Sequence, residues 1–306
     1  MSQLSAICGL HRSGTTFVGE ILKQSGVCVV HEPLNEQFGM EGIPVAYPFV
    51  EKRSDPFSGL LDDAVHFARP WNKDASLLNA GSVRRGLYAL TGGRSGLLWA
   101  WLRFARRTGW ARDHICFKDP FMTLATPYLV GEHGLKMVCM IRHPAAIHQS
   151  TIRQGWNFRV ENLRRQANLI QRYGQDTPLT HWQAAEESPA ASIALLWKMM
   201  YRINTALSAS DSRLLVIRHE DLCLEPMEVT RRILGHLGVA MTSVVEQFVV
   251  AHSEAGIAVP AGNKVHNFRR NSQDLVDEWR ETIDTGDEKV IREMSGEDVV
   301  RCYGKW

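Results

Sequence analysis

The sequence predicts an α/β fold: a doubly wound parallel sheet with a P-loop, helices on both faces, and helical insertions. Two observations predict it. Short apolar runs alternate with segments of helical periodicity, which is typical of a parallel sheet buried on both faces. The first run leads into a glycine-containing turn and then a helix, the order of elements in a P-loop. The apolar runs lie at residues 4–10, 27–31, 114–118, 136–142 and 213–218.

The first strand, turn and helix predict an anion site. Residues 9–16 read Gly-Leu-His-Arg-Ser-Gly-Thr-Thr, which is P-loop spacing with Thr15 where a nucleotide triphosphatase has lysine. Backbone N–H groups of such a turn, and the N-terminus of the helix after it, face the anion. Arg12 supplies the charge that the missing lysine would carry, so a phosphate-like group is still expected. The alternative is a turn that merely links strand to helix. The candidate ligands are Arg12, Ser13, Gly14, Thr15 and Thr16.

Each later apolar run also ends in polar or charged residues. The carboxyl ends of parallel strands meet at one edge of a sheet, where ligands bind in such folds. We therefore expect five strand ends to pool their side chains there, namely Arg12, Glu32, Lys118, Arg142 and His219. Two clear helical patterns, at residues 189–208 with Ser188 as N-cap and at residues 226–237 before Gly238, are interpreted as packing helices.

Composition indicates one globular domain spanning residues 1–306, because no Pro/Gly/Ser-rich linker divides the chain. The start of the chain leaves no room for a leader, and no apolar run is long enough to span a membrane, so we expect a cytoplasmic protein. The six cysteines include no C-x-x-C pair, and those at 8, 28, 116 and 139 lie in apolar runs. Buried free thiols are expected, and a structural zinc site is a weak alternative.

An insertion rich in arginine and tryptophan is expected at about residues 34–112. Within it, residues 82–112 hold seven arginines and no acidic residue. Three interpretations compete: a solvated basic helix that covers the sheet, a face for an acidic substrate or carrier, and a membrane-surface helix. Nucleic acid is not favoured, because the net charge is +2 and no recognition motif accompanies the segment.

These fragments, in this order, resemble the sulfotransferases that use 3′-phosphoadenosine 5′-phosphosulfate (PAPS). Residues 11–16 look like the family's 5′-phosphosulfate loop, and residues 140–144 with Ser150 look like its 3′-phosphate motif. Residues 32–34 match the Glu-Pro of carbohydrate sulfotransferases, and residues 117–121 are similar to a stretch of tyrosylprotein sulfotransferases. Residues 269–272, followed by Trp279-Arg280, look like the closing segment of the carbohydrate branch.

The resemblance implies a role for each matching residue. Residues 12–16 would hold the 5′-phosphosulfate, with Arg12 and Lys118 as cations for the leaving group. Arg142, Ser150 and Arg270 would hold the 3′-phosphate, with Arg269 as the alternative to Arg270. Glu32 would be the general base. His11 and His143, which flank the two phosphate motifs, are interpreted as structural or supporting residues, and Asp221 as architectural.

Alternatives remain open for the two central groups. Glu32 could instead be salt-bridged to a loop arginine, and Lys118 could form a surface pair with Asp119. His31 is the rival base by chemistry. Alternation along a strand sends His31 and Glu32 to opposite faces, so only one of them can serve.

The predicted activity is sulfuryl transfer from PAPS to a hydroxyl or amine of a small-molecule or carbohydrate acceptor, with 3′-phosphoadenosine 5′-phosphate (PAP) as product. A loose in-line transition state needs mainly positioning and cations, so no metal is expected. Two alternatives are an atypical P-loop kinase, which would need Mg²⁺ and ATP, and a non-catalytic PAP-binding module. Protein tyrosine is a less expected acceptor, since only the stretch around Lys118 suggests it.

Overall fold

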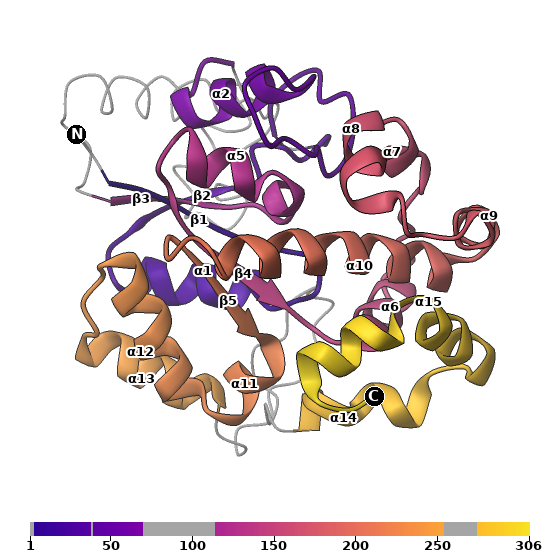
Figure 1. The fold of residues 1–306 in the computed structure, drawn as a ribbon. Coiled ribbons are helices and arrows are strands. Elements are labelled where there is room, and N and C mark those ends of the chain that lie inside the picture. Colours follow the sequence, from indigo (N-terminus) through magenta and orange to yellow (C-terminus); the bar gives the residue numbers. More distant parts are fainter. Residues whose placement is uncertain (1–2, 38, 70–113, 254–273) are drawn as a thin grey trace, which may run out of the picture.

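A parallel five-stranded sheet forms the centre of the protein, in the order β2-β3-β1-β4-β5 (Figure 1). The computed structural model describes residues 3–37, 39–69, 114–253 and 274–306. The predicted fold class is confirmed, and each predicted apolar run forms a strand. The strands are β1 (Gln3–Gly9), β2 (Cys28–His31), β3 (His114–Lys118), β4 (Lys136–Ile141) and β5 (Leu214–Arg218).

Alternate residues of each strand pack against helices on opposite faces of the sheet. On the first face, Ala6 and Cys8 of β1 belong to the larger apolar core. Its helices include α10 (Pro189–Ser208), which begins where predicted: the Ser188 hydroxyl accepts a hydrogen bond from the N–H of Ala191. Other helices on this side include α2 (Ser58–His66), α5 (Thr126–Gly131), α6 (Pro144–Ile152), α9 (Leu179–Glu187) and α15 (Thr285–Tyr303).

On the second face, Ile7 of β1 packs in a smaller apolar core to which three longer helices contribute, together with Leu222 of a short helix after β5. The longer helices are α1 (Thr15–Gln24), α12 (Pro226–Leu237) and α13 (Ser243–Ser253) (Figure 1). The second predicted packing helix, α12, ends as expected at Gly238, whose φ of 70° is left-handed. Helices therefore cover both faces, as the continuous apolar strands require.

Short elements connect this framework. The 3₁₀ helix η2 (Pro120–Leu124) follows β3, and α11 (His219–Leu224) follows β5. Three short turns, α7 (Glu161–Arg164), α8 (Ala167–Leu169) and the π-helical η3 (Ile170–Gly174), precede α9. Helix α14 (Asp274–Thr282) lies beside α6 near the end of the chain (Figure 1).

Cysteine placement agrees with the sequence except at one position. All six thiols are free, and Cys8, Cys116 and Cys139 are buried, but Cys28 is only partly buried. The reason is that β2 is an edge strand, which the sequence pattern does not reveal. No helix among the described residues is both long and apolar enough to cross a membrane. The arginine-rich stretch 82–112 and residues Arg269 and Arg270 lie outside the described residues.

Candidate active site

The loop between β1 and α1 needs its two glycines. A side chain at Gly9, where φ is 133°, would place Cβ 2.2 Å from the backbone oxygen of Met140 on β4. One at Gly14, where φ is 92°, would place Cβ 2.8 Å from the ring of His219. Only glycine adopts both conformations without strain. Strand β4 and the first residue of α11 thus press directly against the loop.

The start of α1 presents backbone donors to the cavity. Helix α1 begins at Thr15, and Gly14 before it offers no side-chain cap. No acceptor among the described residues pairs with the backbone N–H of Thr15 or Thr16, and the first N–H groups of a helix attract anions. Ser13 is placed differently: it is buried beneath the loop, where its hydroxyl donates to the Leu10 carbonyl at 2.6 Å.

The five predicted strand-end residues come together. One cavity of about 1550 Å³ is lined by Arg12, Glu32, Lys118, Arg142 and His219. The loop residues Gly14, Thr15 and Thr16 also line it, as does Ser150 of α6, whereas Ser13 and the rival base His31 do not. The expectation that parallel strands pool their polar ends therefore holds for every strand end named.

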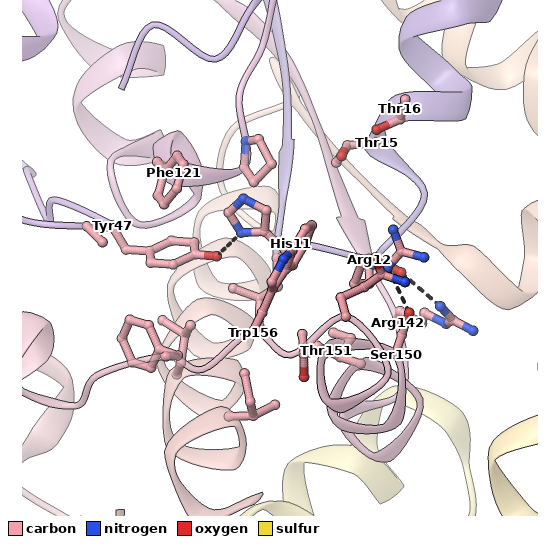
Figure 2. A pocket seen from close by; sticks show the side chains of 18 of the residues that line it. His11, Arg12, Thr15, Thr16, Tyr47, Phe121, Arg142, Ser150, Thr151 and Trp156 are labelled. Atoms are coloured by element: carbon pink, nitrogen blue, oxygen red, sulfur yellow. Dashed lines mark hydrogen bonds between the residues drawn. The ribbon is translucent and has the colours of Figure 1, made fainter. Parts of the chain in front are cut away.

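Two arginines and a serine meet on one side of this cavity (Figure 2). The Nε of Arg12 donates to the Ser150 hydroxyl at 2.7 Å, and Nη1 of Arg142 donates to the Arg12 carbonyl at 2.9 Å. Trp197 of α10 fixes Arg142 in turn, by donating to its carbonyl at 2.8 Å. Burial lowers the pKa of both guanidinium groups, and the charge of Arg142 lowers that of Arg12 further. Two half-desolvated like charges at such a loop favour an anion between them.

Glu32 and Lys118 form an ion pair on the neighbouring strand ends. Lys118 Nζ lies 2.6 Å from Glu32 Oε1, and the Asn35 amide donates to Oε2 at 2.7 Å. Burial raises the pKa of Glu32, but the charge and hydrogen bond of Lys118 outweigh it and hold this pKa at about 2. Glu32 is therefore paired with Lys118 rather than with a loop arginine. The parallel register of β2 and β3, His31 opposite Lys118, brings the two together.

Asp119 does not pair with Lys118 but shapes the backbone. It is fully buried, and its carboxylate accepts hydrogen bonds from the N–H groups of Leu34 at 2.7 Å and Phe121 at 2.9 Å. Burial, with the nearby charge of Glu32, raises its pKa to about 8. Lys118 itself is only 4% exposed, so the alternative of a surface pair with Asp119 is wrong.

Aromatic rings line the other side of the cavity, around His11 (Figure 2). The ring centroid of His11 lies 4.7 Å from that of Phe121 and 5.9 Å from those of Tyr47 and Trp156. The Tyr47 hydroxyl lies 2.5 Å from Nδ1 of His11. Gln166 holds the turn that carries Tyr47: its amide donates to the Tyr47 carbonyl at 3.0 Å and accepts from the N–H of Phe49.

This wall was not foreseen from the sequence. Residues 43–47 carry no motif, and His11 was interpreted as a supporting residue although its ring lines the cavity. His143 fits that interpretation better, because it is buried against Trp279, with ring centroids 4.4 Å apart. Asp221 likewise has an architectural contact, accepting two hydrogen bonds from Arg218.

Backbone strain is concentrated at this cavity. Four residues other than glycine have a left-handed φ in the described part of the chain, and three of them, Arg12, Glu32 and Tyr47, line the cavity. Such conformations cost about 1–3 kcal/mol each and persist where the surroundings impose them. These conformations could not be predicted from the sequence, because none of the three residues is glycine, asparagine or aspartate, which adopt a left-handed φ more readily.

The fold and cavity define an α/β protein with a P-loop-like anion site that lacks the lysine of nucleotide triphosphatases. The chain matches the model of the sulfotransferase family over residues 6–243, and it belongs to that family. No curated protein matches its sequence.

Solved structures similar to this chain include three sulfotransferases. The sulfotransferase domain from the curacin biosynthetic pathway is 15% identical, with 96% of this chain and 97% of that chain covered and a TM-score of 0.47. The corresponding domain of the Synechococcus PCC 7002 olefin synthase is 16% identical, with 95% and 94% covered and a TM-score of 0.44. The sulfotransferase STF1 of Mycobacterium tuberculosis H37Rv is 16% identical, with 83% and 72% covered and a TM-score of 0.40.

Proposed function

We propose that this chain transfers a sulfuryl group from PAPS to a hydroxyl or amine of a small-molecule or carbohydrate acceptor and releases PAP. One observation carries the proposal: a single cavity holds a phosphate loop with two partly buried arginines and, on the adjacent strand ends, a carboxylate paired with a lysine. Membership of the sulfotransferase family supports the reaction class. PAPS as donor rests on the matching loop and Arg142–Ser150 motifs.

The residues present fit a donor with two anionic ends. At the first end, Thr15 and Thr16 line the cavity at the start of α1, where no acceptor among the described residues pairs with their backbone N–H groups. Their hydroxyls are further ligands for the 5′-phosphosulfate. Arg142 and Ser150 are the ligands for the 3′-phosphate, and the proposal keeps Arg270 as a further ligand. When bound, the donor supplies a sulfuryl group activated by its 5′-phosphate.

Glu32, Lys118 and Arg12 have different roles in the transfer. Glu32 takes the proton of the acceptor as the new bond to sulfur forms and the bond from sulfur to the bridging phosphate oxygen breaks. Lys118 and Arg12 stabilise the charge that develops on that leaving oxygen. Because Lys118 keeps the pKa of Glu32 low, Glu32 becomes a stronger base when Lys118 turns from it toward the leaving group. No step of this proposal calls for a metal.

Calorimetric titration with PAP, and separately with ATP and Mg²⁺, tests the donor site. We expect PAP binding that falls at least tenfold in Arg142→Ala, because a charge-assisted contact contributes about 1.5–3 kcal/mol. Arg213→Ala is the matched control, since Arg213 pairs with Asp211 away from the cavity. Mg²⁺-dependent ATP binding without PAP binding would instead support the alternative of an atypical P-loop kinase.

Turnover of PAPS with a panel of alcohols, amines and sugars tests catalysis. We expect Glu32→Gln to keep its affinity for PAP and to lose most turnover. PAP binding that is accompanied by no transfer to any acceptor would favour the non-catalytic PAP-binding module. Unchanged turnover in Glu32→Gln would remove Glu32 from the role of base.

A further inference from the structure

His11 has one ring nitrogen held by Tyr47, and its ring lines the cavity. Nδ1 lies 2.5 Å from the Tyr47 hydroxyl, and the ring stands between Tyr47, Phe121 and Trp156 in the lining of the cavity (Figure 2). Tyr47 is 4% exposed and is held in a left-handed conformation with φ of 57°. The surrounding structure thus imposes a strained backbone on the residue that contacts His11.

The hydrogen bond fixes which nitrogen carries the proton. A phenol is much more acidic than the N–H of a neutral imidazole, so in a neutral pair the hydroxyl donates and the nitrogen accepts. With Nδ1 as acceptor, a neutral His11 carries its proton on Nε2.

The surroundings keep the ring neutral. Burial is the main reason that the pKa of His11 falls to about 4; Glu32 opposes the fall, and Lys118 and Arg12 add to it. Near neutral pH, His11 is therefore a donor at Nε2 and not an imidazolium. The same interactions mean that His11 shares the cavity with the proposed base and both proposed cations.

We propose that His11, oriented by Tyr47, donates its Nε2–H to the nucleophilic oxygen of the acceptor and so makes this site selective for hydroxyls over amines. The inference rests on the proposed sulfuryl transfer and names the acceptor class that the site favours. His11 would be a specificity residue that touches the acceptor, and Tyr47 a residue that positions it.

The selectivity follows from counting lone pairs. An alcohol oxygen has one proton and two lone pairs: the proton goes to Glu32, one pair forms the bond to sulfur, and the second accepts from His11. A neutral primary amine has a single lone pair, and once this attacks sulfur an N–H faces the Nε2–H of His11. An unpaired buried donor costs about 1–3 kcal/mol, so we expect the alcohol to be preferred by about 10- to 100-fold.

The tautomer is measurable without any acceptor. In full-length protein labelled with ¹⁵N-histidine, correlation spectra that link the ring nitrogens to the ring protons identify the protonated nitrogen, and His11→Gln assigns the signals. We expect a protonated Nε2 and a hydrogen-bonded Nδ1 in His11, and loss of the Nδ1 hydrogen-bond shift in Tyr47→Phe. A proton on Nδ1, or a doubly protonated ring at neutral pH, would overturn the proposal.

Selectivity is measured as kcat/KM for matched acceptors with PAPS, such as phenol with aniline and benzyl alcohol with benzylamine, each amine above its pKa. We expect the alcohol-to-amine ratio to fall about tenfold in Tyr47→Phe and in His11→Phe, by the loss of one hydrogen bond. His11→Gln, whose amide nitrogen can replace Nε2, should restore part of it. Trp182→Phe, which changes a buried ring of α9 outside the cavity lining, should leave the ratio unchanged.

The two proposals fail in different ways. Equal use of alcohols and amines by the wild type, or an unchanged ratio in Tyr47→Phe and His11→Phe, would refute the role of His11 while leaving sulfuryl transfer intact. Absence of transfer to every acceptor would instead count against the proposed function. In that case the ¹⁵N spectra still decide whether His11 presents a donor.

Discussion

Replacing Glu32 with glutamine should remove a defined part of the pH dependence of stability. In the folded protein the carboxylate is 21% exposed and lies 2.6 Å from Lys118 Nζ. Its pKa is about 2, against an ordinary value of 4.5. Glutamine has nearly the same shape and can still accept a hydrogen bond, but it carries no charge and does not titrate. The substitution thus removes the ion pair and leaves the packing.

The expected magnitude follows from the pKa. One pKa unit corresponds to about 1.4 kcal/mol, so holding Glu32 at about 2 stabilises the folded protein by about 3 kcal/mol at neutral pH. A carboxylate whose folded pKa is lowered stabilises fully above its unfolded pKa, and this stabilisation is lost as the pH falls through the folded pKa. The difference between wild type and Glu32→Gln should be about 3 kcal/mol near pH 6 and roughly half of that near pH 3.

Equilibrium unfolding in urea, followed by tryptophan fluorescence between pH 6 and pH 3, measures this difference. Glu186→Gln is the matched control, because Glu186 pairs with Arg164 on the surface and should change the free energy of unfolding by less than about 1 kcal/mol. A difference between wild type and Glu32→Gln that stays constant with pH, or that is absent at pH 6, would refute the ion pair as the cause of the low pKa.

Three further substitutions test the loop and the framework. Ser150→Ala removes the partner of Arg12 Nε and should weaken PAP binding about tenfold by calorimetry; unchanged affinity would argue against a donor-site role. Gly14→Ala places a methyl group against the His219 ring at a position with a left-handed φ, so the free energy of unfolding should fall by about 2 kcal/mol or more. An unchanged midpoint of thermal unfolding would contradict the close contact between Gly14 and His219. Ser188→Ala removes the cap of α10 and should cost about 1 kcal/mol in urea unfolding without changing PAPS turnover; a loss of turnover would show that α10 does more than pack.

The periodicity of the sequence predicted the strands and the packing helices correctly. All five strands and both packing helices form where their patterns predict, because continuous apolar runs have few alternatives in a sheet covered on both sides. The strand-end residues Arg12, Glu32 and Lys118 then had to meet at one edge. The contact between Arg12 and Ser150 also follows from this topology, once α6 is placed after β4.

The order of the strands in the sheet could not be predicted from the sequence. Glu32 was expected either to act alone or to bind a loop arginine, but β2 lies beside β3 and not beside β1, so its neighbour is Lys118. Nothing in the local pattern specifies that order. The partial exposure of Cys28 has the same origin, because an edge strand can show the same apolar pattern as a central strand.

The acceptor side of the cavity was the least predictable part. Tyr47 and Gln166 are 119 residues apart and interact through a backbone carbonyl, which any residue could provide. Trp156 lies after the end of α6, in a segment with no periodic pattern. Such walls arise from how loops pack on a framework, whereas the donor side arises from the framework itself.

The left-handed backbone at Arg12, Glu32 and Tyr47 has a consequence for engineering the stability of this protein. Glycine at these positions would relieve about 1 kcal/mol of backbone strain each. It would also remove the ion pair of Glu32 with Lys118 or the buried ring of Tyr47, each of which stabilises the folded protein by more than that. Selection for heat resistance should therefore leave these strained positions unchanged, because the side chains that line the cavity also hold the fold together there.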